Sequence, residues 1–240
     1  MKKKKIIIIL VIVILIAAVV GFCVYRFVFQ NKNETVSTPG HEITKEELPA
    51  EEEINYVEPA SAQVGDKVSF GNYEDQEICW DVIDVQDGKI LLMSTKLIYQ
   101  SPYHNKYENV SWETCDIRKW LNDTFYNASF SDEEKEKIIE TKLKNKPNDM
   151  FGTKGGKPTK DNVFLLSLGE IDEYFVERGS LMAFTRDGTC VWWWLRSPGF
   201  KKNCAAIIGD YGATVKPGHK VFDESVKTGG IRPAMWISVE

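Results

Sequence analysis

The sequence predicts an α+β domain that follows a single membrane-spanning helix. One uncharged run of 20 residues lies near the N-terminus, and 12% of the 240 residues are aromatic, which is enough to fill a sizeable core. Short strand and helix patterns alternate irregularly behind that run, as in α+β folds. We expect four segments. They are a basic tail (1–5), a membrane helix (6–29), an acidic linker (30–63) and one globular domain (64–240).

The membrane helix is predicted from length and flanking charge. Ile6–Tyr25 carries no charge, and as a helix it spans about 30 Å, the thickness of the hydrocarbon core. Lys2–Lys5 precede it and only Arg26 follows closely, so the positive-inside rule places the N-terminus in the cytoplasm. A cleaved signal peptide is the alternative, but its apolar core is usually only about 7–15 residues long. We therefore expect the bilayer as a partner of residues 6–29, with the C-terminal domain outside the cell membrane.

Composition predicts that residues 30–63 form a solvated tether. This segment holds eight acidic and two basic side chains, and few apolar ones. Such a segment buries too little apolar surface to offset its chain entropy. The following domain holds 27 acidic and 23 basic side chains. It therefore offers no basic footprint for nucleic acid.

Eight short strands are expected in the domain. A hairpin is expected at Asp87-Gly88 and another at Asp210-Tyr211-Gly212, while Pro233 favours an edge or bulge in the last strand. The strands are expected at residues 64–70, 76–85, 89–93, 163–166, 190–195, 204–208, 213–215 and 231–239.

Two to three helices are expected among these strands. The first is predicted over 112–126, capped by Ser111, because its apolar residues recur at helical spacing. The second is predicted over 131–143, and a short third helix begins at Ser167. Both begin with capping-box spacing, in which Glu follows the Ser cap by three residues.

The domain resembles a bacterial family without assigned function, the domain-of-unknown-function family 6273. The motifs that carry the resemblance are spread along nearly the whole domain. They are Val64-Gly65-Asp66…Phe70-Gly71, Trp112-Glu113…Leu121-Asn122, Val163-Phe164-Leu165-Leu166-Ser167, Trp193-Trp194-Leu195-Arg196-Ser197-Pro198-Gly199 and Gly230-Ile231-Arg232-Pro233-Ala234.

The order of the late motifs also looks like the C-type-lectin-like fold, including its sulfatase-modifying-factor branch. This resemblance implies that the first and last strands pair, with Val64–Phe70 antiparallel to Ala234–Val239. It implies a binding module more often than an enzyme. The formylglycine-generating enzymes of that group use a closely spaced cysteine pair, and the 14-residue separation of Cys190 and Cys204 departs from their pattern.

Cysteine and histidine positions predict no metal or cofactor site. The domain holds Cys79, Cys115, Cys190 and Cys204, which allow three full pairings. A Cys190–Cys204 disulfide is the closest in sequence, and buried free thiols are the equal alternative. No His-x-x-x-His or Cys-x-x-Cys spacing exists for zinc. Calcium held by scattered loop oxygens stays open.

The Trp192–Trp194 run is the strongest local peculiarity. Trp193 points away from its two neighbours on a strand, so one face is core. The other face either binds sugar or protein or is covered as well, and we favour the covered state. Arg196 and Arg232 pair either with a ligand carboxylate or with an internal acid such as Asp210, and we favour the internal pairing.

The ligand surface is expected at the Arg196–Lys202 end of the tryptophan strand. The candidate ligand-binding residues are Trp194, Arg196, Phe200 and Lys202, and no catalytic residue is proposed. The sequence thus predicts a membrane-anchored extracytoplasmic recognition module for a glycan or protein. One alternative is an extracytoplasmic enzyme or modifying factor that acts on protein or cell wall through Cys190 and Cys204. The other is a structural component of an envelope complex.

Overall fold

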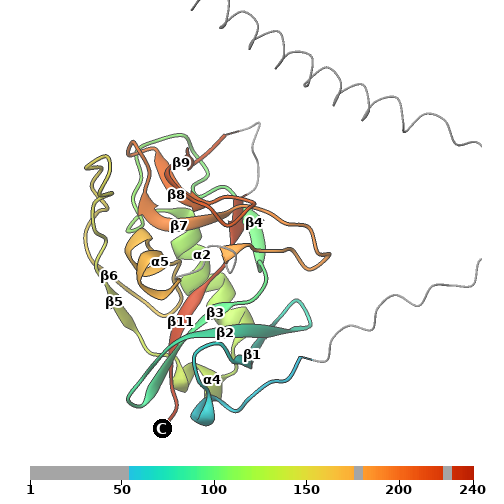
Figure 1. Ribbon diagram of the computed structural model, residues 1–240. Helices are drawn as coiled ribbons and strands as arrows, with labels where there is room; N and C mark the ends of the chain where they lie inside the picture. Colours follow the sequence, from blue (N-terminus) through green and yellow to red (C-terminus); the bar gives the residue numbers. More distant parts are fainter. Residues whose placement is uncertain (1–53, 176–180, 224–228) are drawn as a thin grey trace, which may run out of the picture. The chain divides into compact units, whose positions relative to one another are not determined.

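The computed structural model describes residues 54–175, 181–223 and 229–240 (Figure 1). The predicted membrane helix at 6–29 lies outside these ranges. Within them, no helix has the length and apolar character needed to cross a bilayer.

The folded unit begins before Val64, the predicted start of the domain. Tyr56 forms a β-bridge with Lys67, and Pro59–Ser61 forms the 3₁₀ turn η2. Ala62 is buried in the core. The end of the expected linker therefore contacts the domain, through backbone pairing with β1 and through the buried Ala62, although most side chains of 54–63 are exposed.

The first sheet has four antiparallel strands, in the order β1-β2-β3-β11. Asp87-Gly88 joins β2 to β3, and Gly88 takes the positive φ of 70° that the predicted turn requires. A short turn also joins β1 to β2. Because β2 lies between β1 and β3, the other edge of β3 is free to pair with β11. The strand bounds are Lys67–Tyr73 for β1, Gln76–Gln86 for β2, Lys89–Ser94 for β3 and Ala234–Ser238 for β11.

The predicted pairing of the first strand with the last is wrong. β11 pairs with β3, where Trp236 lies opposite Leu91, while β1 pairs only with β2 among the named strands. The first and last strands are thus opposite edges of one sheet. The closure implied by the lectin-like resemblance is not present.

The second sheet has five strands, in the order β4-β10-β7-β8-β9. The β10–β7 pair is parallel and the others are antiparallel. The strand predicted over 231–239 is divided at Arg232-Pro233 into β10 and β11, which join different sheets. The bounds are Tyr99–Ser101 for β4, Gly229–Ile231 for β10, Trp193–Pro198 for β7, Cys204–Ile208 for β8 and Thr214–Lys220 for β9.

A third sheet has two strands, β5 (Thr141–Leu143) and β6 (Thr159–Asp161). The strand predicted over 163–166 forms instead a single bridge between Phe164 and Ala234. This bridge ties the segment after β6 to β11.

The first helical run is one continuous stretch with three parts. These are α2 (Asp116–Trp120), the π-helical segment η3 (Leu121–Phe125) and α3 (Tyr126–Ser129). The run begins later than predicted because Cys115, not Ser111, caps it. The Cys115 Sγ accepts a hydrogen bond from the Arg118 N–H at 3.4 Å.

The two later helices begin where the capping boxes predict. Helix α4 (Asp132–Lys137) is capped by Ser131, and α5 (Leu168–Tyr174) by Ser167. Helix α4 ends earlier than predicted, because Ile138 takes an extended conformation and bridges to Ile237. The mixed α+β class, with mainly antiparallel sheets and short helices, is confirmed.

Aromatic side chains dominate the core. Figure 1 shows the four-stranded sheet toward the lower end of the view and the five-stranded sheet toward the upper end, with α2 between them. Trp80 and Trp112 are fully buried, and so are Trp193 and Trp194 of the tryptophan run. Trp192 is partly buried against Trp194, with ring centroids 4.7 Å apart. Trp193 is thus covered on one face of the run, and Trp194 and the partly buried Trp192 on the other, in agreement with the favoured prediction that both faces are covered.

Candidate functional site

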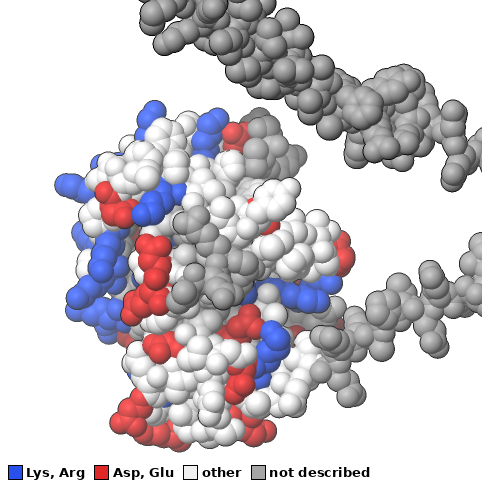
Figure 2. All heavy atoms as spheres, viewed as in Figure 1, with Lys and Arg blue, Asp and Glu red and all other residues white. Residues whose placement is uncertain are grey.

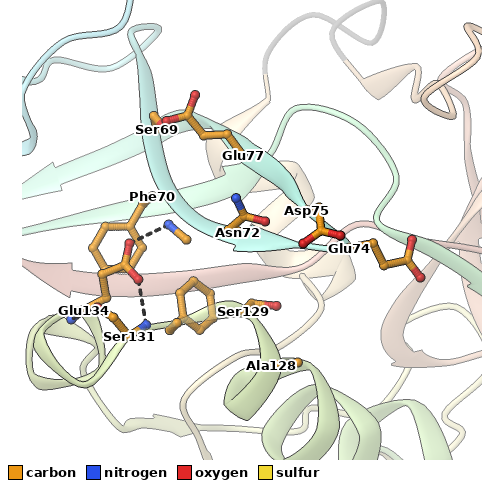
Figure 3. A pocket seen from close by; sticks show the side chains of 12 residues that line it. Ser69, Phe70, Asn72, Glu74, Asp75, Glu77, Ala128, Ser129, Ser131 and Glu134 are labelled. Carbon is orange, nitrogen blue, oxygen red and sulfur yellow. Dashed lines mark hydrogen bonds between the residues drawn. The ribbon is translucent and has the colours of Figure 1, made fainter.

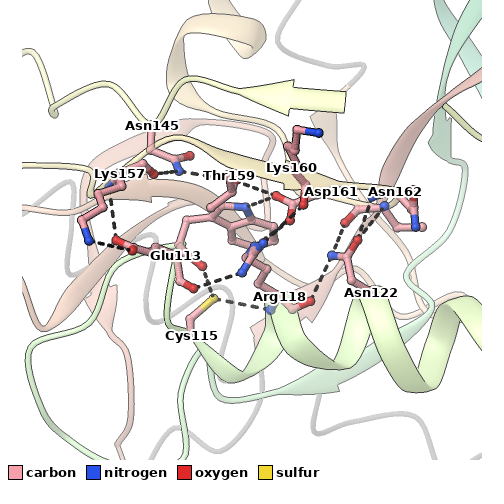
Figure 4. A network of polar contacts seen from close by, with 12 residues as sticks. Glu113, Cys115, Arg118, Asn122, Asn145, Lys157, Thr159, Lys160, Asp161 and Asn162 are labelled. Carbon is pink, nitrogen blue, oxygen red and sulfur yellow. Dashed lines mark hydrogen bonds and ion pairs between the residues drawn. The ribbon is translucent and has the colours of Figure 1, made fainter. Parts of the chain in front are cut away.

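The motif residues of the first helix build a buried polar network around Asp161 (Figure 4). The Asp161 carboxylate is fully buried and pairs with the Arg118 Nε at 2.6 Å. It also accepts hydrogen bonds at 2.8 Å from the Trp112 indole N–H and the Thr159 hydroxyl. Asn122 donates to the Val163 carbonyl and accepts from the Asn162 N–H, both at 2.8 Å. These residues hold the chain after β6 against the helix, which is a structural role.

Arg196 is an internal brace. Its side chain is 4% exposed, and both of its terminal nitrogens contact the Glu170 carboxylate. Burial alone would raise the pKa of Glu170, but the Arg196 guanidinium and hydrogen bonds from Ser167 together hold that pKa below its usual value. The predicted internal pairing is confirmed, although the partner is Glu170 and not Asp210.

Arg232 is braced in the same way. Its Nε donates to the Ser94 carbonyl at 2.7 Å, and its guanidinium pairs with Asp81 at 3.0 Å. The guanidinium carbon also lies 5.5 Å from the Trp193 ring centroid. Burial lowers the pKa of Arg232, and Asp81 opposes this effect.

The four predicted ligand-binding residues do not meet on one surface. Trp194 is buried, and its indole N–H donates to the Ser101 carbonyl at 2.9 Å. Arg196 is enclosed with Glu170, whereas Phe200 and Lys202 are exposed. Phe200 instead meets Phe151 edge-on, with ring centroids 6.4 Å apart. Of the four residues, only Phe200 and Lys202, in the loop after β7, are exposed to a ligand.

Asn148 joins the two loops that carry Phe151 and Phe200. It is 1% exposed and donates to the carbonyls of Pro198 and Lys216, at 2.8 and 2.9 Å. The β5–β6 ribbon leads into the same part of the molecule, and Figure 2 shows Lys and Arg side chains gathered along that edge.

Of the two alternatives for Cys190 and Cys204, a disulfide or free thiols, the structure has free thiols. All four cysteines of the described residues are free thiols. Cys190 precedes Trp193, which lies opposite Ile208, whereas Cys204 lies near Pro198 at the other end of the β7–β8 pair. Burial also raises the pKa of the Cys204 thiol. The reactive pair that the enzyme alternative requires is therefore not assembled.

An exposed aromatic platform lies elsewhere, at the edge strand β4. The Tyr99 ring is 48% exposed and stacks on Trp120 from α2, with centroids 5.4 Å apart and an interplanar angle of 26°. Tyr73, from the end of β1, meets Trp120 edge-on at 6.1 Å. The exposed Tyr99 ring thus stacks on a tryptophan that Tyr73 in turn contacts, so aromatic residues of three elements meet here.

A hollow of about 510 Å³ lies beside this platform, and we call it the Tyr99 groove. Its volume falls within the range of small-molecule sites. Arg186 is fixed in the groove because its guanidinium pairs with Glu74 at 3.3 Å and donates to the Tyr73 carbonyl at 3.0 Å. The groove is lined by Glu74, Leu97, Ile98, Tyr99, Gln100, Thr185, Arg186 and Asp187.

A second hollow of about 640 Å³ lies between the β1–β2 turn and the α3–α4 region, and we call it the acidic hollow (Figure 3). Glu74 lines both hollows. Asp75 and Glu77 line the acidic hollow from the hairpin side, and Glu134 lines it from the helical side. The Glu134 carboxylate accepts hydrogen bonds at 2.8 Å from the N–H groups of Gly71 and Ser131.

Sequence reasoning missed both hollows. Trp120 lies in the predicted helix 112–126, and the helical spacing of its apolar residues does not indicate that its ring stacks on an exposed tyrosine. The one local signal was the polar turn Glu74-Asp75 between two strand patterns. The other groove residues come from β4 and from the 185–187 turn, far away in the sequence, so local spacing cannot bring them together.

Comparison with known proteins identifies a family but no function. A family model for a domain of unknown function, DUF6273, matches residues 87–239, which is more than half of the chain. No curated protein and no solved structure matches. The match contains the late motifs and the Asp161 network, while the motif at Val64–Gly71 precedes it. The chain belongs to the DUF6273 family.

Proposed function

We propose that this chain is a membrane-anchored, extracytoplasmic binding module that takes a glycan in the Tyr99 groove. The observation that carries the proposal is the exposed Tyr99 ring. This ring stacks on Trp120 at a centroid distance of 5.4 Å. A large aromatic ring that is half exposed yet held in one orientation is typical of a binding surface.

The chemistry of the groove suits a sugar. The C–H face of a pyranose packs on an aromatic ring, while its hydroxyl groups require both donors and acceptors around it. Arg186 supplies donors, Asp187 supplies acceptors and the Gln100 amide supplies both. Asp187 is itself held by the Thr185 hydroxyl and by the Thr189 N–H. A site whose side chains are already positioned loses less entropy when the ligand binds.

The cellular setting of the proposal rests on the sequence. The uncharged run after four lysines supports a signal anchor at 6–29 with a cytoplasmic N-terminus, in a bacterial envelope. The acidic linker then supports a domain held off the membrane surface. The order of the late motifs, which resembles that of lectin-like domains, also favours binding, although the first and last strands do not pair.

The proposal is tested with the full-length chain in detergent micelles and a panel of cell-wall and other envelope oligosaccharides. We expect at least one oligosaccharide to bind, and we expect Tyr99→Ala to weaken it roughly tenfold or more, because a central aromatic contact is lost. Tyr211→Ala is the matched control, since Tyr211 is 88% exposed and does not line the groove. If no oligosaccharide binds, or if both variants bind equally well, the groove is not a glycan site.

A further inference from the structure

The loops after β5 and β7 together expose a group of large apolar side chains. Met150 is 63% exposed, Phe151 41% and Phe200 43%, and the two phenylalanine rings lie edge to face. Single exposed apolar side chains are ordinary on a protein surface, whereas several that lie together mark a surface that another molecule or a membrane covers.

Three lysines of the same loops lie beside these apolar residues. Lys154 follows Phe151 in the β5–β6 loop, and Lys201 and Lys202 directly follow Phe200. All three are exposed, and the Lys201 ammonium lies 5.1 Å from the Phe200 ring centroid. Within the described ranges, none of the three forms an ion pair with an acid. We call the six residues the loop patch: Met150, Phe151, Lys154, Phe200, Lys201 and Lys202.

Hydrogen bonds hold both loops of the patch in place. Asn148 joins the two loops through its side chain. Its backbone closes the turn that carries Phe151, because its N–H donates to the Thr153 carbonyl at 2.9 Å and its carbonyl accepts from the Gly152 N–H at 2.8 Å. The Phe200 N–H donates to the Pro217 carbonyl at 3.0 Å. The patch is therefore displayed on an ordered backbone, which lowers the entropy that is lost when it binds.

We infer that the loop patch docks the folded unit on a bilayer that contains anionic lipid. Phenylalanine and methionine side chains gain by leaving water for the boundary between headgroups and acyl chains, and neighbouring lysines are attracted to anionic headgroups. A soluble polyanion would leave the apolar side chains uncovered. A second copy of this chain fits less well, because a symmetric contact would bring the lysines of both copies together.

The chain before the folded unit keeps the patch within reach of a bilayer. If 6–29 is the anchor, residues 30–53, about 24 in number, separate it from the folded unit. A tether of that length has a root-mean-square span of roughly 25–30 Å and an extended length of about 80 Å. A domain of this size is about 40 Å across. The patch can therefore reach the membrane, although the chain enters the folded unit on a different side from the β5–β6 ribbon (Figure 1).

Tethering also makes a weak surface sufficient. The second contact of an anchored chain is intramolecular, with an effective concentration on the order of millimolar. The linker then permits a docked state and a raised state of the domain. This inference goes beyond the glycan proposal, and the lining of the Tyr99 groove includes no loop-patch residue, so either can fail without the other.

The test places single full-length chains in lipid nanodiscs of phosphatidylcholine alone or of an equimolar mixture with phosphatidylglycerol. Amide hydrogen exchange is measured in the 148–153 and 198–203 segments. We expect exchange in both to be about threefold slower or more in the anionic discs, because amides covered about two-thirds of the time exchange only in the remaining third. Added salt should reduce the slowing. Equal exchange in the two kinds of disc would overturn the inference.

One variant removes the aromatic part of the patch. For Phe151→Ser combined with Phe200→Ser, we expect the same exchange in both kinds of disc, because little apolar surface is left to enter the bilayer. A thermal melt checks that the variant folds, and the comparison between discs cancels any general loosening of the loops. Tyr211→Ser is the matched control, since Tyr211 is exposed in the turn between β8 and β9 and lies outside the patch. It should keep the threefold slowing.

A second variant removes charge and keeps the rings. Lys201→Gln combined with Lys202→Gln should show less slowing at low salt than the wild type, because two attractive charges are lost. Lys96→Gln combined with Lys137→Gln makes the same change of net charge at two exposed lysines outside the patch, and it should behave as the wild type. If both double variants reduce the slowing equally, the loop patch is not the docking surface.

Two further outcomes would assign the patch to another occupant. If soluble polyphosphate slows exchange in the neutral discs, and does so equally in the Phe151 and Phe200 variant, the patch binds a polyanion by charge alone. If exchange slows only in discs that hold two chains, a second copy covers the patch. Either outcome overturns the inference, and neither concerns the Tyr99 groove.

Discussion

At the scale of single residues, arginine–carboxylate pairs, each with one buried side chain, hold the family motifs in place. Arg118 pairs with Asp161, Arg196 with Glu170 and Arg232 with Asp81. Residue type alone predicts that a buried guanidinium needs an acid, because an unpaired charge is costly inside a protein. It does not predict which acid, since Glu170 reaches Arg196 only after α5 has packed against β7.

The Arg196–Glu170 pair predicts a pH-dependent loss of stability. Arg196→Ala leaves the Glu170 carboxylate largely buried without a cation, so the free energy of unfolding should fall by about 3 kcal/mol at pH 7. The pKa of Glu170 is lowered in the folded protein. Its stabilising contribution is therefore present above the unfolded-state pKa and is lost as the pH falls through the lower, folded-state pKa. Urea denaturation over a pH series measures both effects.

The control for this prediction is an exposed ion pair. Lys160 contacts Glu140 at 2.8 Å, and both side chains are more than half exposed. Lys160→Ala should leave stability nearly unchanged and keep the acid-side slope of the wild type. Arg196→Ala should instead have a flatter acid-side slope, because the contribution from Glu170 is already gone. A wild-type slope in Arg196→Ala would show that Glu170 does not carry this dependence.

At the scale of elements, the sequence predicts helix caps and tight turns correctly, but it does not predict which distant strands pair. The capping boxes at Ser131 and Ser167 and the hairpin at Asp87-Gly88 were correctly predicted, because each depends on residues a few positions apart. The start of α2 was missed because a cysteine acts as its cap. The pairing of β11 with β3 was missed because it joins segments more than 140 residues apart.

Asn148 predicts a coupling between two loops. Asn148→Ala would leave the Pro198 and Lys216 carbonyls without their donor, so stability should fall by about 2 kcal/mol. Amide hydrogen exchange should accelerate in both the 148–153 and the 198–203 segments. Asn127→Ala, at an exposed helical position, should change neither quantity. Faster exchange in only one segment would show that Asn148 does not join them.

At the scale of the whole molecule, the candidate site is assembled by the fold. The Tyr99 groove combines the β1–β2 turn, the start of β4 and the 185–187 turn, and α2 supports its aromatic wall. The sequence motifs contain Arg118, Arg196 and Arg232, and the structure shows that these arginines form internal ion pairs. The proposed ligand surface instead consists of common polar residues, which only the fold brings together.

The arrangement of the whole chain about the membrane gives the last prediction. If residues 6–29 form a signal anchor, a protease added to intact cells should cut within 30–53 and release a fragment that begins before the folded unit. The folded unit itself should resist, because the buried core found among residues 54–240 protects its backbone. Replacing Lys2–Lys5 with glutamine weakens the positive-inside signal, so a larger share of the chains should then be protected in intact cells. Release only after the cells are permeabilised would place the domain in the cytoplasm. The Tyr99 groove could not then meet an envelope glycan, even if it bound one in solution.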